Sequence, residues 1–109
     1  MNVNEKFSAL RKGLLEFLVL QIISAGKVYA ADILKLLNVT EFATQEGTLY
    51  PLLSKMRRDG LLDYDWKESE AGPPRKYYEL TAKGQEQLRE TLEYWGEINA
   101  TVKKLGQKT

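Results

Sequence analysis

The stretch TQEGTLYPLLSKMRRDG, residues 44–60, has the pattern of a short helix with two different faces. Four apolar residues recur at helical spacing and can point together into a core: Leu49, Leu52, Leu53 and Met56. The opposite side carries hydroxyl groups and cations, on Thr48, Tyr50, Ser54, Lys55, Arg57 and Arg58. A helix with an apolar back and such a front can lie in the major groove of DNA, although an ordinary surface helix has the same pattern.

The ends of this helix and a proline within it also need a physical account. Thr44 is placed to act as the N-cap, and Gly60 follows the last basic residues as a C-terminal stop would. Pro51 removes one backbone hydrogen bond and usually starts or kinks a helix. Either the helix begins near Tyr50, or Gly47 leaves room for the proline ring. We expect the second, and therefore one continuous helix.

The composition narrows the classes of function. The chain has 109 residues, which fits one domain, and its net charge of +1 does not by itself indicate a nucleic-acid binder. It contains neither cysteine nor histidine, which excludes a zinc site, a Ser-His triad and histidine acid–base catalysis. An enzyme is therefore the weakest alternative, and we expect no metal and no cofactor. Without an apolar run of about 20 residues or a signal-peptide pattern, we expect a cytoplasmic protein and no membrane span.

Two helices are expected before residue 44. The first, over residues 4–25, is apolar around most of its circumference from Leu14 onward, so it must be buried on more than one side. Either a second subunit covers it, or it is the central core helix of a monomer. The second helix is short, over residues 29–37, and its inward-facing residues are Ile33, Leu34 and Leu37.

The spacing of the apolar residues changes after Gly60. In LLDYDWKES, residues 61–69, Leu62, Tyr64 and Trp66 alternate with charged residues, as in a half-buried strand. EAGPP, residues 70–74, indicates a turn, and RKYYEL, residues 75–80, is the return strand of a β-hairpin. Tyr77 and Tyr78 point to opposite faces of that strand, so one of them belongs to the core.

The last segment is a helix capped by Thr81 that runs to about Leu105. Its apolar residues form a near-heptad seam: Leu88, Leu92, Trp95, Ile98, Val102 and Leu105. The order helix, helix, helix, hairpin, helix predicts a mainly α (α+β) protein. We expect one domain of residues 1–109, with a winged helix-turn-helix over about residues 5–81 and an added C-terminal dimerisation helix over about residues 82–105.

Two blocks of the sequence resemble a known family. They are GTLYPLLSKMRRDGLL, residues 47–62, and GPPRKYYELTAKG, residues 72–84, with WKES at residues 66–69 between them. With these blocks the chain resembles the PadR family of bacterial transcriptional regulators over nearly its whole length. It looks like the small branch with a single helix after the wing, and Trp95 resembles the tryptophan of multidrug-binding repressors. The resemblance implies a homodimeric repressor whose two recognition helices meet successive major grooves of a pseudo-palindromic operator.

The resemblance also indicates which residues contact double-stranded DNA. On the recognition helix the matching positions are Thr48, Tyr50, Ser54, Lys55 and Arg58, whose hydroxyls and cations can reach base edges and phosphates. Tyr29 and Lys35, on or just before the second helix, are candidates for phosphate contacts. At the wing, a stiff tip of Gly72, Pro73 and Pro74 places Arg75 and Lys76 beside phosphates or the minor groove. Alternatively, Arg75 pairs with Glu70 on the surface.

A ligand site is expected at the dimer centre. A tryptophan in an apolar seam is most often a packing residue, but two Trp95 side chains facing each other across a two-fold axis can sandwich a flat aromatic molecule. By resemblance, such a pocket takes an aromatic drug or a phenolic ligand. The matching residues are Leu10, Phe17, Gln21, Leu88, Trp95 and Asn99. Phe17 can instead fill part of this pocket.

Three functions follow from these observations. The leading one is a repressor released by the aromatic ligand, which requires that the ligand favour a different spacing of the recognition helices. The second is a DNA-binding repressor without a small-molecule effector. The third is a winged-helix protein-interaction module that binds no nucleic acid, which the near-neutral net charge favours.

Overall fold

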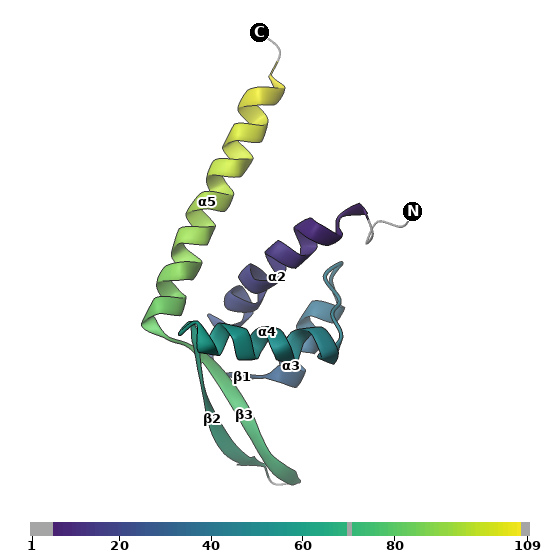
Figure 1. The fold of residues 1–109 in the computed structure, drawn as a ribbon, viewed down its shortest axis with the longest axis vertical. Helices are drawn as coiled ribbons and strands as arrows, with labels where there is room; N and C mark the ends of the chain where they lie inside the picture. The colour runs from purple at the N-terminus through teal and green to yellow at the C-terminus, as the bar shows by residue number, and fades with distance from the viewer. Residues whose placement is uncertain (1–5, 70, 108–109) are drawn as a thin grey trace.

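The structure is a computed structural model that describes residues 6–69 and 71–107. Within them it has four helices and a three-stranded antiparallel sheet, in the order α2 (Ser8–Ile23), β1 (Val28–Tyr29), α3 (Ala30–Asn38), α4 (Glu46–Arg58), β2 (Leu62–Ser69), β3 (Gly72–Leu80) and α5 (Ala82–Gly106). The predicted winged helix-turn-helix is confirmed: α3 and α4 form the helix-turn-helix, and β2 and β3 form the wing (Figure 1). None of the helices in this part of the chain is both long and apolar enough to cross a membrane. The predicted helix start at Asn4, and Glu70 as a partner of Arg75, lie outside the described residues.

The hydrophobic core lies where α2, α3, α4 and the base of the wing meet. The predicted inward faces of the second helix and the recognition helix are confirmed, because their buried residues are Ile33, Leu37, Leu49, Leu53 and Met56. Leu34 and Leu52 are partly buried against this core. The first helix begins at Ser8, so the prediction that Phe7 belongs to it was wrong, because Phe7 is its N-cap. It ends at Ile23, two residues earlier than predicted, and contributes four buried side chains.

The recognition helix α4 runs without a break through Pro51, as expected. Its N-cap is Gln45, so the prediction that Thr44 caps this helix was wrong. The Thr44 hydroxyl is occupied elsewhere, because it donates a hydrogen bond to the carbonyl of Phe42 at 2.8 Å. The predicted stop is confirmed: Gly60 has a φ of +80°, a conformation that glycine adopts without strain, and it ends the helix.

The short strand β1 was not predicted from the sequence. Val28 pairs with Tyr78 and Tyr29 with Tyr77, which places β3 between β1 and β2. The second helix therefore begins at Ala30, one residue later than predicted. Of the two adjacent tyrosines on β3, Tyr78 is buried and Tyr77 is partly exposed, as the alternation of strand side chains predicts.

The predicted tip of Gly72, Pro73 and Pro74 was wrong, because these residues belong to strand β3. Lys67 pairs with Arg75, whereas Ser69 pairs with Gly72, so the register shifts between these pairs. The two prolines face a single residue of β2 in this irregularity. Prolines are tolerated at a bulge because they have no N–H to offer to the strand ladder.

The last helix, α5, stands away from the body at the end opposite to the wing (Figure 1). Its predicted cap is confirmed, because the Thr81 hydroxyl accepts a hydrogen bond from the N–H of Gly84 at 2.9 Å. Leu88 is buried in the core. The remaining seam residues are exposed within the single chain: Leu92, Trp95, Ile98, Val102 and Leu105.

Candidate nucleic-acid interface

The exposed side of α4 has a central ridge and two flanks. Residues in an α-helix are about 100° apart, so the positions opposite the buried Leu49, Leu53 and Met56 are Pro51, Ser54 and Arg58. Tyr50 and Arg57 lie on the flank toward the wing, and Thr48 and Lys55 lie on the flank toward α2. All seven of these residues are exposed. The helix therefore offers hydroxyls and cations over its whole outer side.

Four of the predicted DNA-binding residues come together in one groove between α3, α4 and β3, which we call the wing groove. Its volume is about 430 Å³, and its lining residues are Tyr29, Ala30, Ala31, Tyr50, Arg75, Lys76 and Tyr78. The guanidinium carbon of Arg75 lies 5.1 Å from the centre of the Tyr29 ring. Two cations and three phenols thus converge beside the first turn of α3. Such a set of donors suits a phosphate group.

Tyr29 is held in this groove by a neighbouring tyrosine. The rings of Tyr29 and Tyr77 lie with their centres 3.7 Å apart, and their hydroxyls are hydrogen-bonded to each other. This hydrogen bond, together with burial, raises the pKa of Tyr29 above its ordinary value. Because Tyr29 also precedes α3, its backbone N–H donates to the Asp32 carboxylate at 3.3 Å. With its pKa raised, the Tyr29 phenol is neutral near pH 7.

A second groove continues from the first along α4. Its volume is about 250 Å³, and its lining residues are Leu53, Ser54, Arg57, Arg58, Tyr64, Lys76 and Tyr78. The Arg57 guanidinium carbon and the Lys76 Nζ each lie 4.4 Å from the centre of the Tyr64 ring. Arg57 was missed as a site residue by the sequence prediction, although its position three residues after Ser54 indicates an exposed place on the same helix.

Three predicted DNA-binding residues do not join these grooves. The Nζ of Lys55 lies 3.0 Å from Asp59 and 3.6 Å from Glu16 on α2. Its hydrogen bond to Asp59, followed by the charge of Glu16, raises the pKa of Lys55. Thr48 lines a separate groove of about 270 Å³ next to Arg11. Lys35 is exposed in the last turn of α3, at the opposite end of that helix from Tyr29.

Comparison with known proteins identifies the family of this chain. The model of the transcriptional regulator PadR-like family matches residues 19–90. The chain belongs to the PadR-like family of transcriptional regulators. It is 43% identical to a PadR-like transcription factor from Bacteroides fragilis, with 94% of this chain and 99% of that chain covered and a TM-score of 0.81. A PadR-like transcriptional regulator from Bacillus cereus is 41% identical, with 93% and 99% covered and a TM-score of 0.82. A Streptococcus transcriptional regulator is 32% identical, with 90% and 97% covered and a TM-score of 0.80.

A PadR-like regulator acts on transcription and is not an enzyme, and membership of the family supports DNA as its partner. Within the described residues, no group of three or more acidic side chains is placed to hold a metal ion.

The predicted ligand residues of this PadR-like regulator lie on α2 and α5. The rings of Phe17 and Trp95 are in contact, with centres 6.4 Å apart and planes tilted by 46°. Leu10, Gln21 and Asn99 are exposed, whereas Leu88 is buried in the core. Within one chain, therefore, Phe17 and Trp95 are adjacent, and Leu88 packs inward against the core.

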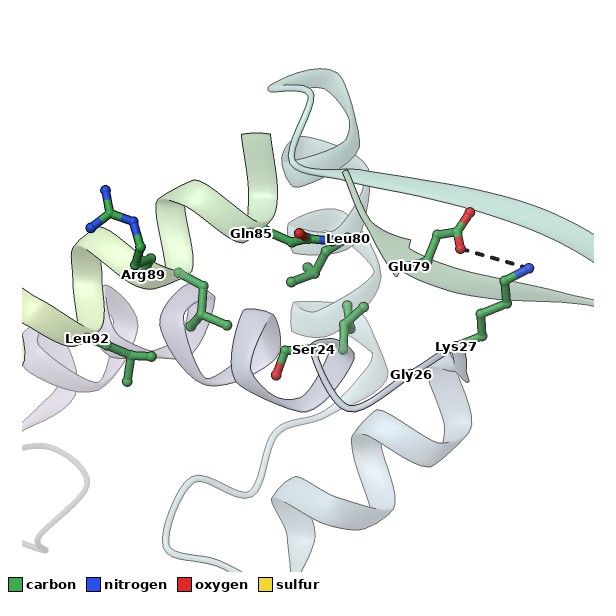
Figure 2. Close-up of a pocket in the computed structure, with 10 residues that line it drawn as sticks. Ser24, Gly26, Lys27, Glu79, Leu80, Gln85, Arg89 and Leu92 are labelled. Atoms are coloured by element: carbon green, nitrogen blue, oxygen red, sulfur yellow. Dashed lines mark ion pairs between the residues drawn. The ribbon is translucent and has the colours of Figure 1, made fainter. Parts of the chain in front are cut away.

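A groove at the start of α5 does not coincide with the predicted ligand site. It has a volume of about 400 Å³ and is lined by Ile23, Ser24, Gly26, Lys27, Glu79, Leu80, Gln85, Leu88, Arg89 and Leu92. Figure 2 shows it between the end of α2, the end of β3 and the first turns of α5. Lys27 at one end pairs with Glu79 at 3.8 Å, and the Arg89 guanidinium pairs with Glu86 and Glu93. Of the predicted ligand residues, only Leu88 is part of this lining.

Proposed function

We propose that this PadR-like regulator is a cytoplasmic homodimer that binds a pseudo-palindromic operator in double-stranded DNA as a repressor. A planar aromatic molecule, either a drug or a phenolic compound, releases it by binding at the dimer centre. The observation that carries the proposal is the convergence of Tyr29, Tyr50, Arg75 and Lys76 in the wing groove beside the exposed side of α4. A recognition helix and a wing that share one donor-rich groove can hold the DNA backbone between them.

The wing groove supports a phosphate contact in three ways. Arg75 and Lys76 supply positive charge, and the tyrosine hydroxyls supply neutral hydrogen-bond donors. The backbone N–H groups at the start of α3 belong to Ala30 and Ala31, which also line the groove, and a helix N-terminus favours anions. With a phosphate fixed there, Ser54 and Arg58 on the central ridge would face the base edges of the major groove. Lys35, Thr48 and Lys55 would contact the flanking backbone.

The homodimer is proposed from the exposed seam of α5. From Leu92 to Leu105 the seam spans about 20 Å of helix at 1.5 Å per residue, and a single chain leaves it in water. The Val102 side chain is 64% exposed, so Val102→Asp should leave the fold of one chain intact. Sedimentation equilibrium should report a dimer for the wild type and a monomer for Val102→Asp. A wild-type protein that stays monomeric at high micromolar concentration would contradict the proposal.

The effector is proposed from Trp95, whose indole is partly exposed on the seam and in contact with Phe17. Trp66→Phe leaves Trp95 as the sole tryptophan of the chain, so its fluorescence should be quenched by a planar aromatic dye. Trp95→Ala should abolish dye binding. Dye at saturation should weaken operator binding, and an unchanged operator affinity would contradict release. The contact between Phe17 and Trp95 favours the alternative of a repressor without an effector, because Phe17 occupies one side of the indole.

DNA binding is tested by selecting bound genomic fragments at low salt and then titrating one fragment with salt. The slope of log K against log salt should be roughly −0.9 per phosphate neutralised. Lys76→Gln should make this slope shallower by about 0.9 per half-site. Lys104→Gln, an exposed cation in the last turn of α5, is the matched control and should leave the slope unchanged. Recovery of no genomic fragment would instead favour a protein-interaction module.

A further inference from the structure

The face of the wing that looks toward α4 carries a row of alternating rings and cations. In the antiparallel register, Tyr64 lies opposite Tyr78, and Trp66 lies opposite Lys76. Side chains two residues apart on a strand share a face, so all four point the same way. Tyr78 at the base of this row is buried, and its partner Tyr64 receives Arg57 from α4. The row therefore begins in the core and runs outward along the wing.

Trp66 is at the outer end of this row, and its side chain is 60% exposed. The Trp66 ring meets the Tyr64 ring edge-on, with ring centres 6.2 Å apart. The Nζ of Lys76 lies 5.3 Å from the centre of the Trp66 ring. These contacts fix the orientation of the indole but cover little of it. The apolar seam of α5 lies at the opposite end of the molecule (Figure 1), so packing along that seam is remote from Trp66.

The charges around Trp66 indicate the chemistry of its partner. Single exposed apolar residues are common on protein surfaces, but Trp66 lies among cations. On its face of the wing the cations are Lys76, over the indole itself, and Arg57 of α4, over the neighbouring Tyr64 ring. Lys67 and Arg75 are on the opposite face, where they lie over Tyr77 and Tyr29. Of the acidic residues near it on β2, Glu68 shares the face of Trp66, whereas Asp65 is on the other face, 3.9 Å from Lys27. A flat apolar ring bordered by cations fits a polyanion that also has apolar walls, which describes the sugar-lined minor groove of DNA.

We propose that the indole of Trp66 packs against the deoxyribose wall of the minor groove next to the major groove that receives α4. Lys76 then pairs with the adjoining phosphate. This inference rests on the proposed DNA binding and adds to it a contact that is not ionic. Cations at a wing supply affinity that salt screens, whereas an apolar contact supplies affinity that salt leaves nearly unchanged.

The test compares two substitutions on a duplex taken from a genomic fragment that the wild type binds. Trp66→Ala should weaken binding about tenfold per half-site, as expected for losing one apolar face of a tryptophan, and leave the salt slope unchanged. Lys76→Gln should make the slope shallower. Trp66→Phe should keep most of the affinity. Wild-type affinity in Trp66→Ala would overturn the inference while leaving the proposed function in place. A wild-type protein that binds no duplex would overturn the proposed function itself.

A second measurement does not depend on how Trp66→Ala folds. The chain has only two tryptophans, so Trp95→Phe leaves Trp66 as the sole fluorophore. Acrylamide quenching of this protein should fall several-fold when the duplex saturates it, because the groove wall would cover the indole. Trp66→Phe, which reports on Trp95, is the matched control and should show a much smaller change. Equal quenching of Trp66 with and without bound duplex would overturn the inference.

Discussion

The junction between α4 and α5 depends on a glycine that should not tolerate a methyl group. Gly84 is in the first turn of α5, and its N–H is bound to the Thr81 hydroxyl. A Cβ at this position would overlap the carbonyl oxygen of Leu61 and lie 3.1 Å from the carbonyl carbon. That oxygen accepts a hydrogen bond from the N–H of Thr81 at 3.1 Å. The carbonyl cannot retreat without weakening this bond, because both partners are backbone atoms.

The cost of Gly84→Ala follows from these contacts. Overpacking against backbone costs about 1–3 kcal/mol, and weakening one hydrogen bond adds about 1 kcal/mol. Alanine is more favourable than glycine in a helix, which offsets this loss of stability by at most about 1 kcal/mol. The net loss of unfolding free energy is therefore about 2 kcal/mol, which lowers Tm by roughly 10 °C in a chain of this size.

Thermal unfolding followed by circular dichroism measures this loss, at one fixed protein concentration because a dimer has a concentration-dependent Tm. Gly47→Ala is the matched control. It is also a glycine in a helix, but a Cβ there meets no atom within 4 Å. It should raise the unfolding free energy by up to about 1 kcal/mol. If Gly84→Ala proved as stable as Gly47→Ala, the close approach of α5 to Leu61 would be refuted.

Three further predictions concern the DNA-binding face. Gly47 is exposed on the outer side of α4, so Gly47→Ala should bind the operator several-fold more weakly although its fold is more stable. Equal affinity of the two proteins in a gel-shift titration would show that DNA does not approach Gly47. Burial raises the pKa of Tyr78, and the hydroxyl of Tyr77 raises that of Tyr29, so both phenols should ionise above the ordinary value of about 10. The stability that these neutral phenols provide is present below a pH of about 10 and is lost as the pH rises through their folded pKa values. In a pH titration followed by tyrosinate absorbance, Tyr78→Phe should lack one component that ionises late in the wild type. Glu16→Gln should tighten binding by up to about twofold at low salt, because it removes one of the two carboxylates that pair with Lys55 and leaves Asp59 in place. This gain should vanish at high salt.

The helices were predictable because their signals are local. The spacing of Leu49, Leu53 and Met56 is sufficient to orient α4, and Gly60 at positive φ ends it. Continuity through Pro51 was also predictable, because a proline removes only one hydrogen bond of a helix that is fixed by three buried side chains.

The features that the sequence did not predict depend on distant partners. β1 exists because Val28 meets Tyr78, and no pattern within two residues signals that pairing. Pro73 and Pro74 have the composition of a turn, yet the irregular register opposite β2 admits them to a strand. The wing groove is likewise tertiary, because Tyr29, Tyr50 and Arg75 are far apart in sequence and converge only when β1 pairs with β3. The residue types in the sequence were enough to predict each of these side chains as a DNA contact, but they could not show which of them share a groove.

Two physical connections join the seam of α5 to the recognition helix, and they differ in stiffness. The first passes through α2, where Phe17 contacts Trp95 and its neighbour Glu16 pairs with Lys55 at 3.6 Å. An exposed ion pair of this kind contributes about 1 kcal/mol or less, so it can break without moving α4. The second passes through the junction at the end of α4, where Lys83 donates to the Asp59 carbonyl at 2.7 Å. At the same junction, the backbone of Gly84 packs directly on the backbone carbonyl of Leu61. A tilt of α5 would therefore be transmitted to α4 mainly through its C-terminal end. Lys83→Met should then weaken any effect of an aromatic ligand on operator binding more than Glu16→Gln does.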